Sequence, residues 1–226
     1  MKEYDSSSPL IFIHIPKAAG SSVQQIFKLW YGDSLHYHYF NEQTSALPEK
    51  LVLDSLQPTS RPMVLYGHFN MLRGFGVEDY YPEVNQFITI LRNPFEGAIS
   101  SYYYIRSAGT AWQDQTYVPA TDLRQYLREA PVHMLNHFPR QVTKENYREL
   151  IEEFFVYIGI MEDLSESVRW IAHKLGKPFK PDWLPHVNMT PRDQDYPDDL
   201  LDEFRHMHSL EFEVYDYVAS KFTPSS

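Results

Sequence analysis

The sequence predicts an α/β fold in which a central parallel sheet carries helices on both faces. Continuous apolar runs of strand length, such as "PLIFIHI" at 9–15 and "NQFITILR" at 85–92, are typical of strands that are covered on both sides. Segments with helical spacing follow these runs, and strands that alternate with helices build parallel sheets. With 226 residues, 43% of them hydrophobic, the chain suits a single domain over 1–226 with a sizeable core.

Four strands and at least six helices are expected along the chain. The predicted strands are apolar and rich in β-branched or aromatic residues, and they lie at 9–15, 62–69, 85–92 and 155–160. The predicted helices show apolar residues at helical spacing and lie at 21–32, 94–106, 121–129, 143–154 and 162–176, with one or two more from 197 onward. Asn93 and Pro94 have the residue types of a helix cap and a first helical position. In such folds ligands bind at the carboxyl ends of the strands.

Composition excludes several classes of function. The chain has no cysteine, which excludes disulfides, thiolate catalysis and cysteine-based metal centres. Its net charge of −10 argues against broad nucleic-acid binding. No apolar run approaches the roughly 20 residues that span a bilayer, and the polar start lacks the pattern of a signal peptide, so we expect a soluble, cytoplasmic protein without membrane insertion. The histidine pairs at 36–38 and 206–208 lack carboxylates at ligand spacing and are interpreted as surface or packing residues rather than a metal site.

The turn between the first strand and its helix has the residues of an anion site. Backbone N–H groups at a helix start carry partial positive charge, Lys17 adds a full one, and Ser21 and Ser22 add hydroxyl donors. Gly20 is expected to let the backbone approach a ligand closely. The nucleotide motif GxxxxGK[ST] does not fit, because Ser21 stands in the lysine position and the first glycine is missing. A tight turn with a solvated lysine is the plain structural alternative.

A second anionic group can be held where the strand at 85–92 ends. Arg92 closes that strand, and Ser100 lies about two turns into the following helix, so a guanidinium and a hydroxyl can grip a terminal phosphate. The structural alternative is an arginine that pairs with Glu96 or Asp79.

His68 ends the predicted strand at 62–69, and in a parallel sheet it emerges at the same edge as Lys17. A histidine is suited to remove a proton from a hydroxyl at neutral pH. A structural histidine that only donates a hydrogen bond is the alternative.

These segments resemble a known enzyme family. "IHIPKAAGSS" is similar to the 5′-phosphosulfate loop of sulfotransferases that use 3′-phosphoadenosine-5′-phosphosulfate (PAPS), and "ILRNPFEGAISSYYYIR" to their 3′-phosphate motif. "YGHFNML", "YIGIMEDLSESVRWIAHKLG" and "PHVNMTPR" resemble the carbohydrate branch typified by heparan sulfate and chondroitin uronyl 2-O-sulfotransferases, with its small bacterial relatives. The resemblance implies a P-loop-NTPase-like sheet, PAPS as donor, PAP as product, no metal, and a hydroxyl acceptor, a carbohydrate being favoured.

The resemblance also implies roles for individual residues. His68 would be the base and Lys17 the group that neutralises the leaving phosphate. The cofactor would be held by these residues: Lys17, Ala18, Ala19, Gly20, Ser21, Ser22, Arg92, Ser100, Thr190 and Arg192. The segments 107–140 and 177–196 are expected to cover the acceptor and the cofactor, with Arg106, Trp112, His137 and Arg140 as acceptor contacts.

Two positions depart from the family pattern. Gly97 stands where a second arginine is usual, and Asn93 where an aspartate is usual, which leaves the acceptor type open. A sulfotransferase that acts on tyrosine or a small metabolite is an alternative at the level of the substrate. A nucleotide kinase that needs Mg²⁺, or a nucleotide-binding protein without turnover, is an alternative at the level of function. The oligomeric state is not predicted.

Overall fold

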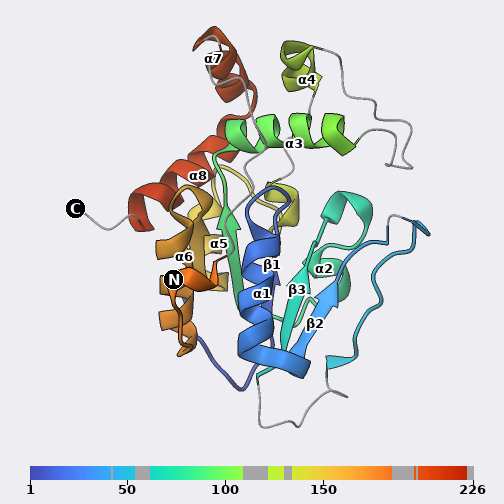
Figure 1. Ribbon diagram of the computed structural model, residues 1–226, viewed down its shortest axis with the longest axis vertical. Helices are drawn as coiled ribbons and strands as arrows, with labels where there is room; N and C mark the ends of the chain where they lie inside the picture. The colour runs from blue at the N-terminus through green and yellow to red at the C-terminus, as the bar shows by residue number, and fades with distance from the viewer. Residues whose placement is uncertain are drawn as a thin grey trace.

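A five-stranded parallel sheet forms the centre of the molecule, in a computed structural model that describes residues 1–41, 43–53, 62–108, 122–129, 134–184, 196 and 198–222 (Figure 1). The strand order is β2-β3-β1-β4-β5, and every neighbouring pair is parallel. The strands are β1 (Leu10–Ile13), β2 (Leu35–His38), β3 (Val64–Gly67), β4 (Phe87–Leu91) and β5 (Phe155–Ile160). The predicted α/β fold in one domain is confirmed.

Helices follow β1, β3, β4 and β5 along the chain, and two more helices close it. The α-helices are α1 (Gly20–Tyr31), α2 (Val77–Tyr80), α3 (Pro94–Ala108), α4 (Leu123–Glu129), α5 (Tyr147–Phe154), α6 (Leu164–Leu175), α7 (Asp198–Met207) and α8 (Ser209–Phe222). Short 3₁₀ turns are η1 (Gly32–Ser34), η3 (Met71–Arg73), η5 (Leu135–His137), η6 (Met161–Asp163) and η7 (Pro181–Trp183). None of the helices in the described ranges is long and apolar enough to cross a membrane.

Each face of the sheet buries its own hydrophobic core. Alternate residues of a strand point to opposite faces, and β1 shows the division clearly. Leu10 and Phe12 pack with residues of α1 and α6, whereas Ile11 and Ile13 pack with residues of α5 and α8. All four side chains are at most 1% exposed, as expected for a central strand between two helical layers. This double covering explains why the central strands are continuous apolar runs.

The edge strand β2 was not predicted from the sequence. Its sequence LHYH has a single aliphatic residue, so it shows neither an apolar run nor a strict alternation. His38 at its end is 1% exposed and stacks on Phe69 with ring centroids 4.4 Å apart, so its interpretation as a packing residue is confirmed. Tyr37 remains 48% exposed because β2 is covered less completely than the inner strands.

Helices α3, α4 and α7 lie beyond the carboxyl ends of the strands (Figure 1). They share a third hydrophobic core with α8, which includes Phe95, Leu127, Phe204 and Phe212. Cap contacts start α3, because the Asn93 side chain accepts hydrogen bonds from the N–H groups of Phe95 and Glu96 at 3.1 and 3.3 Å. The predicted helix cap at Asn93 is therefore confirmed.

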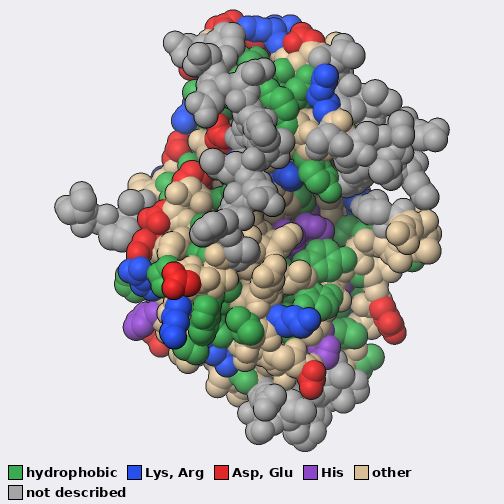
Figure 2. Space-filling model, viewed as in Figure 1, with side chains coloured by type: hydrophobic (Ala, Val, Ile, Leu, Met, Phe, Trp, Pro, Cys, Tyr) green, Lys and Arg blue, Asp and Glu red, His purple; other side chains and the backbone are tan. Residues whose placement is uncertain are grey.

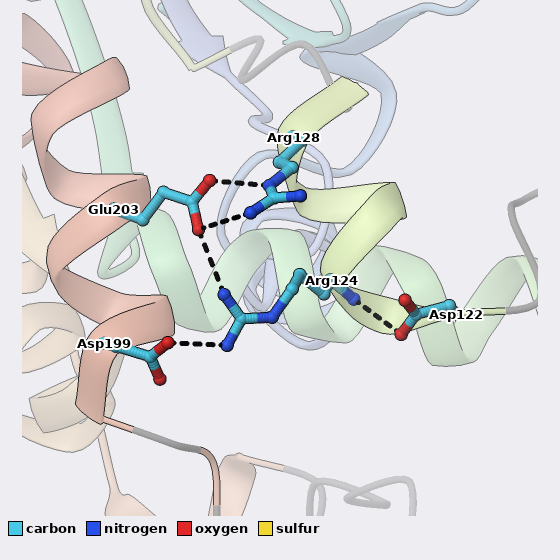
Figure 3. Close-up of polar contacts among 5 residues, drawn as sticks. All are labelled: Asp122, Arg124, Arg128, Asp199 and Glu203. Carbon is cyan, nitrogen blue, oxygen red and sulfur yellow. Dashed lines mark hydrogen bonds and ion pairs between the residues drawn. The ribbon is translucent and has the colours of Figure 1, made fainter.

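An ion-pair network joins α4 to α7 (Figure 3). Arg124 contacts Asp199 at 2.8 Å and Glu203 at 3.2 Å, and Arg128 contacts Glu203 at 2.6 Å. The hydrogen bond to Arg128 holds the pKa of the Glu203 carboxyl below its usual value. Because these side chains are largely solvated, the network fixes the pairing of the two helices more than it adds stability.

Helix α8 buries a carboxyl group against η5. Glu211 is 8% exposed, and its Oε1 accepts a long hydrogen bond, 3.4 Å, from the N–H of Leu135. Its Oε2 is buried without a hydrogen-bond partner among the described residues. Burial therefore raises the pKa of Glu211 to about 8, so the side chain is protonated in the folded protein at neutral pH.

We predict that Glu211→Gln stabilises the protein increasingly as the pH rises. In the unfolded chain the carboxyl ionises near 4.5, whereas in the folded protein its pKa is about 8. Between these values the unfolded state binds fewer protons, so rising pH favours unfolding of the wild type. Glutamine keeps an oxygen for Leu135 but cannot ionise. Thermal melts should show little difference near pH 4.5 and a growing advantage of the variant up to pH 8.

The matched control is Glu153→Gln, a substitution at an exposed position of α5. Its melting temperature relative to the wild type should not follow this trend. Parallel melting curves of wild type and Glu211→Gln across the same pH range would contradict the buried, protonated carboxyl.

Candidate active site

The loop between β1 and α1 is held by side chains that bind carbonyl oxygens of the loop and of the two residues that flank it. Thr89 Oγ1 donates to the carbonyl of Ile13 at 2.8 Å, and Tyr66 Oη donates to that of Gly20 at 2.6 Å. His68 Nδ1 lies 2.5 Å from the carbonyl oxygen of His14. These donors come from the neighbouring strands β3 and β4 or directly follow β3. Because a carbonyl oxygen that faced an anion would repel it, binding these oxygens within the protein favours anion binding at the loop.

Arg92 supplies a further contact to this loop. Its Nη1 donates to the carbonyl oxygen of Lys17 at 3.0 Å, which joins the end of β4 directly to the loop after β1. Its side chain is 12% exposed and also lies 3.7 Å from the carboxylate of Glu96. The ion pair with Glu96 was the structural alternative for Arg92, and the structure contains it together with the loop contact. Asp79 instead binds the N–H of Gly76.

The backbone of the loop is strained at alternate residues. Lys17 has φ 64° and Ala19 has φ 58°, in the left-handed region that non-glycine residues seldom adopt. Such conformations persist where the surrounding structure holds them, and they cluster at functional sites. Helix α1 then begins at Gly20 without a side-chain cap and without an acidic residue in its first turn. Within its own first turn, α1 therefore has no acidic side chain to neutralise its positive end.

Three of the predicted residues follow neighbouring strands of the sheet: His68 follows β3, Lys17 follows β1 and Arg92 follows β4. The ammonium group of Lys17 sits over the ring of Tyr104 from α3, 3.9 Å from the centroid. Ser21 is exposed, Ser22 is half-buried, and Ser100 on α3 is 6% exposed. The structure thus brings together the loop, Arg92 and one face of α3 at the carboxyl edge of the sheet.

Three histidines and a tyrosine form a cluster beside the loop. The rings of His14 and His68 lie 4.3 Å apart at an angle of 32°, and His137 lies 6.0 Å from His68. Tyr39 packs edge-on against His68 at 4.9 Å, and its hydroxyl lies 2.9 Å from Nδ1 of His14. Of this cluster, the sequence singled out His68 and His137 only.

The tautomer of His68 follows from its hydrogen bond. The carbonyl oxygen of His14 can only accept, so Nδ1 of His68 must carry the proton. In the neutral ring Nε2 then holds the lone pair, as a base requires. Burial, with smaller contributions from His68 and His137, lowers the pKa of His14 to about 2, so His14 stays neutral.

The structure gives a reason for glycine at position 20 that the sequence did not suggest, namely the close packing of the His14 ring. A β-carbon at this position would lie 1.8 Å from Cδ2 and 2.0 Å from Nε2 of His14. The absence of a side chain at Gly20 therefore makes room for an imidazole of the protein itself. The expected close approach of a ligand to the backbone is not tested.

The remaining predicted residues lie elsewhere or outside the described part of the chain. Arg106 binds the hydroxyl of Tyr102 at 2.8 Å on α3. Arg140 donates to the carbonyl of Pro82 at 3.0 Å and lies over the ring of Phe154, which directly precedes β5. Arg140 is therefore at the amino end of the sheet, away from the loop. Residues 112, 190 and 192, predicted as Trp112, Thr190 and Arg192, lie outside the described residues.

Figure 2 shows histidine atoms near the middle of one face, with hydrophobic atoms below them and Lys or Arg atoms above. Within the described ranges, no three His, Asp or Glu side chains are arranged to hold a metal ion. This edge places the cations Lys17 and Arg92 near the imidazole of His68.

Comparisons with known proteins bear on the fold. No family model matches the sequence, and no curated protein matches it either. A sulfotransferase structure from Alicyclobacillus acidocaldarius matches 93% of this chain and 95% of its own, with 14% identity and a TM-score of 0.54. The fold is the one seen in that bacterial sulfotransferase. At this identity the comparison shows the fold alone.

Two other structures are less similar. Mouse sulfotransferase SULT7A1 complexed with PAP matches over 94% of this chain and 66% of its own, with 12% identity and a TM-score of 0.48. Retinol dehydratase in complex with androsterone and inactive cofactor PAP matches over 93% and 66%, with 11% identity and a TM-score of 0.43. Both TM-scores are below 0.5 and lower than that of the bacterial sulfotransferase.

We predict opposite stability effects for one substitution at two helical glycines. Gly20→Ala forces the new methyl into the His14 ring and should destabilise by about 1–3 kcal/mol. Gly97→Ala places its methyl in open space within α3 and should stabilise by about 0.5–1 kcal/mol. Chemical denaturation of both variants measures the difference. Equal effects of the two substitutions would contradict the packing of His14 on Gly20.

Proposed function

We propose that this protein transfers a sulfuryl group from PAPS to a hydroxyl acceptor. The observation that carries the proposal is the 3.0 Å contact from Arg92 to the carbonyl oxygen of Lys17. It joins the two segments that resemble the 5′-phosphosulfate loop and the 3′-phosphate motif of PAPS-dependent enzymes. The fold shared with a bacterial sulfotransferase supports the same reading.

The donor would be held by both segments at once. The positive end of α1, the hydroxyls of Ser21 and Ser22, and Lys17 suit the 5′-phosphosulfate. The Arg92 guanidinium and Ser100 suit the 3′-phosphate, with Arg92 turning partly from Glu96 to the ligand. Thr190 and Arg192 are proposed to close over the nucleotide.

His68 would act as the base in a single displacement. Its Nε2 takes the proton of the acceptor hydroxyl while the acceptor oxygen forms a bond to sulfur. The bond from sulfur to the 5′-phosphate oxygen breaks, and its electron pair stays on that oxygen. Lys17 neutralises the charge that grows there, and no metal is needed in this scheme. Most of the rate enhancement would come from positioning and fixed charge.

A carbohydrate is the acceptor we propose. Support comes from the resemblance to the carbohydrate branch and from the aromatic rings next to the proposed base. Tyr39 contacts His68, and Tyr37 lies 6.3 Å from Tyr39 and is 48% exposed. Exposed aromatic rings are suited to pack on sugar faces. His137 and Arg106 are further proposed contacts of the acceptor.

The donor proposal predicts a clear preference in ligand binding. PAP without metal should raise the melting temperature, because it binds the folded state only. ATP with Mg²⁺ should raise it much less, because the loop lacks the lysine position and first glycine of the ATP motif. A thermal-shift titration measures both. A larger shift with ATP and Mg²⁺ than with PAP would favour a nucleotide kinase instead.

The mechanism predicts that variants of His68 and Lys17 both lose turnover, but that only the Lys17 variant binds PAP more weakly. His68→Ala should lower kcat by about 10²–10⁴-fold and leave the affinity for PAP nearly unchanged. Lys17→Ala should lower kcat by about 10²–10³-fold and also weaken PAP. Transfer of ³⁵S from labelled PAPS to an oligosaccharide panel measures kcat. The matched control is His36→Ala on β2, which should retain full turnover.

Unchanged kcat in His68→Ala would remove histidine as the base. Cofactor binding without turnover on any acceptor class, including tyrosine peptides and small alcohols, would favour a nucleotide-binding protein without catalysis.

A further inference from the structure

We propose that the His14 imidazole is a positioning residue that holds the His68 ring in register with the phosphate-binding loop. The proposal rests on the sulfuryl transfer proposed above. His14 was not singled out in the sequence, where it reads as one more residue of the first strand.

His14 contacts His68 through both its main chain and its side chain. Its carbonyl oxygen receives the Nδ1 proton of His68 and so fixes the tautomer. Its ring lies against the His68 ring, with centroids 4.3 Å apart. The hydrogen bond alone leaves the His68 ring able to swing about the bonded nitrogen, and the packed imidazole removes that freedom.

The same imidazole contacts the first residue of α1. Its Cδ2 and Nε2 occupy the space where a side chain at Gly20 would begin. Gly20 itself is fixed from β3, because its carbonyl oxygen accepts the hydrogen bond of Tyr66 at 2.6 Å. The ring of His14 therefore fills the gap between the proposed base and the start of the helix that would hold the 5′-phosphosulfate. A change in the position of Gly20 therefore reaches His68 through the packed ring of His14.

Two further side chains hold His14 in place. The Tyr39 hydroxyl lies 2.9 Å from Nδ1 of His14, and Gln24 Nε2 donates to that hydroxyl oxygen at 3.4 Å. Tyr39 also packs edge-on against His68. His14 thus has a neighbour on each side: Tyr39 at its nitrogen, Gly20 under its edge and His68 on its face.

The charge state of His14 suits this role. It is 9% exposed, and the titratable groups of the described residues that face it are Tyr39, Tyr66, His68 and His137. Burial keeps its pKa near 2, so it remains neutral when His68 takes up a proton. Two adjacent imidazolium ions would repel each other, and a neutral neighbour avoids this cost.

A first experiment reads the ring of His68 directly, without any substrate. Long-range ¹H–¹⁵N spectra of the labelled full chain distinguish the two tautomers of each neutral histidine, and His68→Gln assigns the signals of His68. In the wild type at pH 8 we expect His68 in the single Nδ1–H form. In His14→Ala the main-chain carbonyl of residue 14 remains, but without the packed imidazole the His68 ring can turn away from it for part of the time, so we expect shifts averaged between both forms.

A second experiment separates positioning from donor binding. His14→Ala should lower kcat about 10- to 100-fold, with the KM for PAPS changed by about twofold or less. His14→Phe should restore most of kcat, because it keeps a ring between Gly20 and His68. His36→Ala, a histidine of the edge strand β2, is the matched control and should match the wild type in both experiments.

Two variants guard against a misfolded His14→Ala. Gly20→Ala keeps the His14 imidazole but pushes it out of its place. It should therefore cause the same averaging between the tautomers of His68 and the same fall in kcat as His14→Ala. The double variant Gly20→Ala with His14→Ala should regain the stability that Gly20→Ala loses, because the clash is gone. If the stability losses of the two single variants simply added in the double variant, the two residues would not be coupled.

The outcomes distinguish this proposal from the proposed function. If the wild type transfers no sulfuryl group, the proposed function is wrong, and the spectra still show whether His14 holds the His68 ring in one tautomer. A single, unchanged tautomer of His68 in His14→Ala, or unchanged kcat there, overturns the role of His14. A rise in KM for PAPS with constant kcat would assign His14 to the loop alone and also overturn it.

Discussion

The hydrogen bond from Arg92 to the carbonyl oxygen of Lys17 is the contact on which the site depends. A guanidinium that is 12% exposed needs acceptors within the protein, and here one of them is a main-chain oxygen of the loop after β1. The contact places the cation of one strand end against the backbone of the next. Together with Thr89, Tyr66 and His68, it fixes the loop by its carbonyl oxygens and helps to maintain the left-handed backbone at Lys17.

Much of the fold follows from the hydrophobic pattern. The strands β1, β3, β4 and β5 are buried on both faces, so their sequences are largely apolar and they were predicted within a few residues of their bounds. The helix after β4 was predicted from Asn93 and Pro94, and the cap is present. The edge strand β2 was missed because one covered face and four residues give no readable pattern.

A residue of the site could be predicted from the sequence only where a chemically suitable side chain directly follows a predicted strand. Lys17, His68 and Arg92 each follow a strand, and a parallel sheet brings such positions to one edge. The proposed positioning role of His14 could not be predicted from the sequence, because Gly20, Tyr39 and His68, which contact it, lie in three separate segments of the chain. Arg140 was expected to contact the acceptor, but it packs at the amino end of the sheet, and nothing in its local sequence indicates this position.

The central claim is that one nucleotide is bound by Arg92 and by the loop after β1 at the same time. Calorimetric titrations with PAP and with adenosine 5′-phosphate, which lacks the 3′-phosphate, test it most directly in the wild type and in Arg92→Ala. We expect PAP to bind more tightly than adenosine 5′-phosphate in the wild type, and we expect Arg92→Ala to reduce this advantage by about 10- to 100-fold. Arg140→Ala, at the far end of the sheet, should preserve it. An advantage of PAP that is the same in the wild type and in Arg92→Ala would contradict the account.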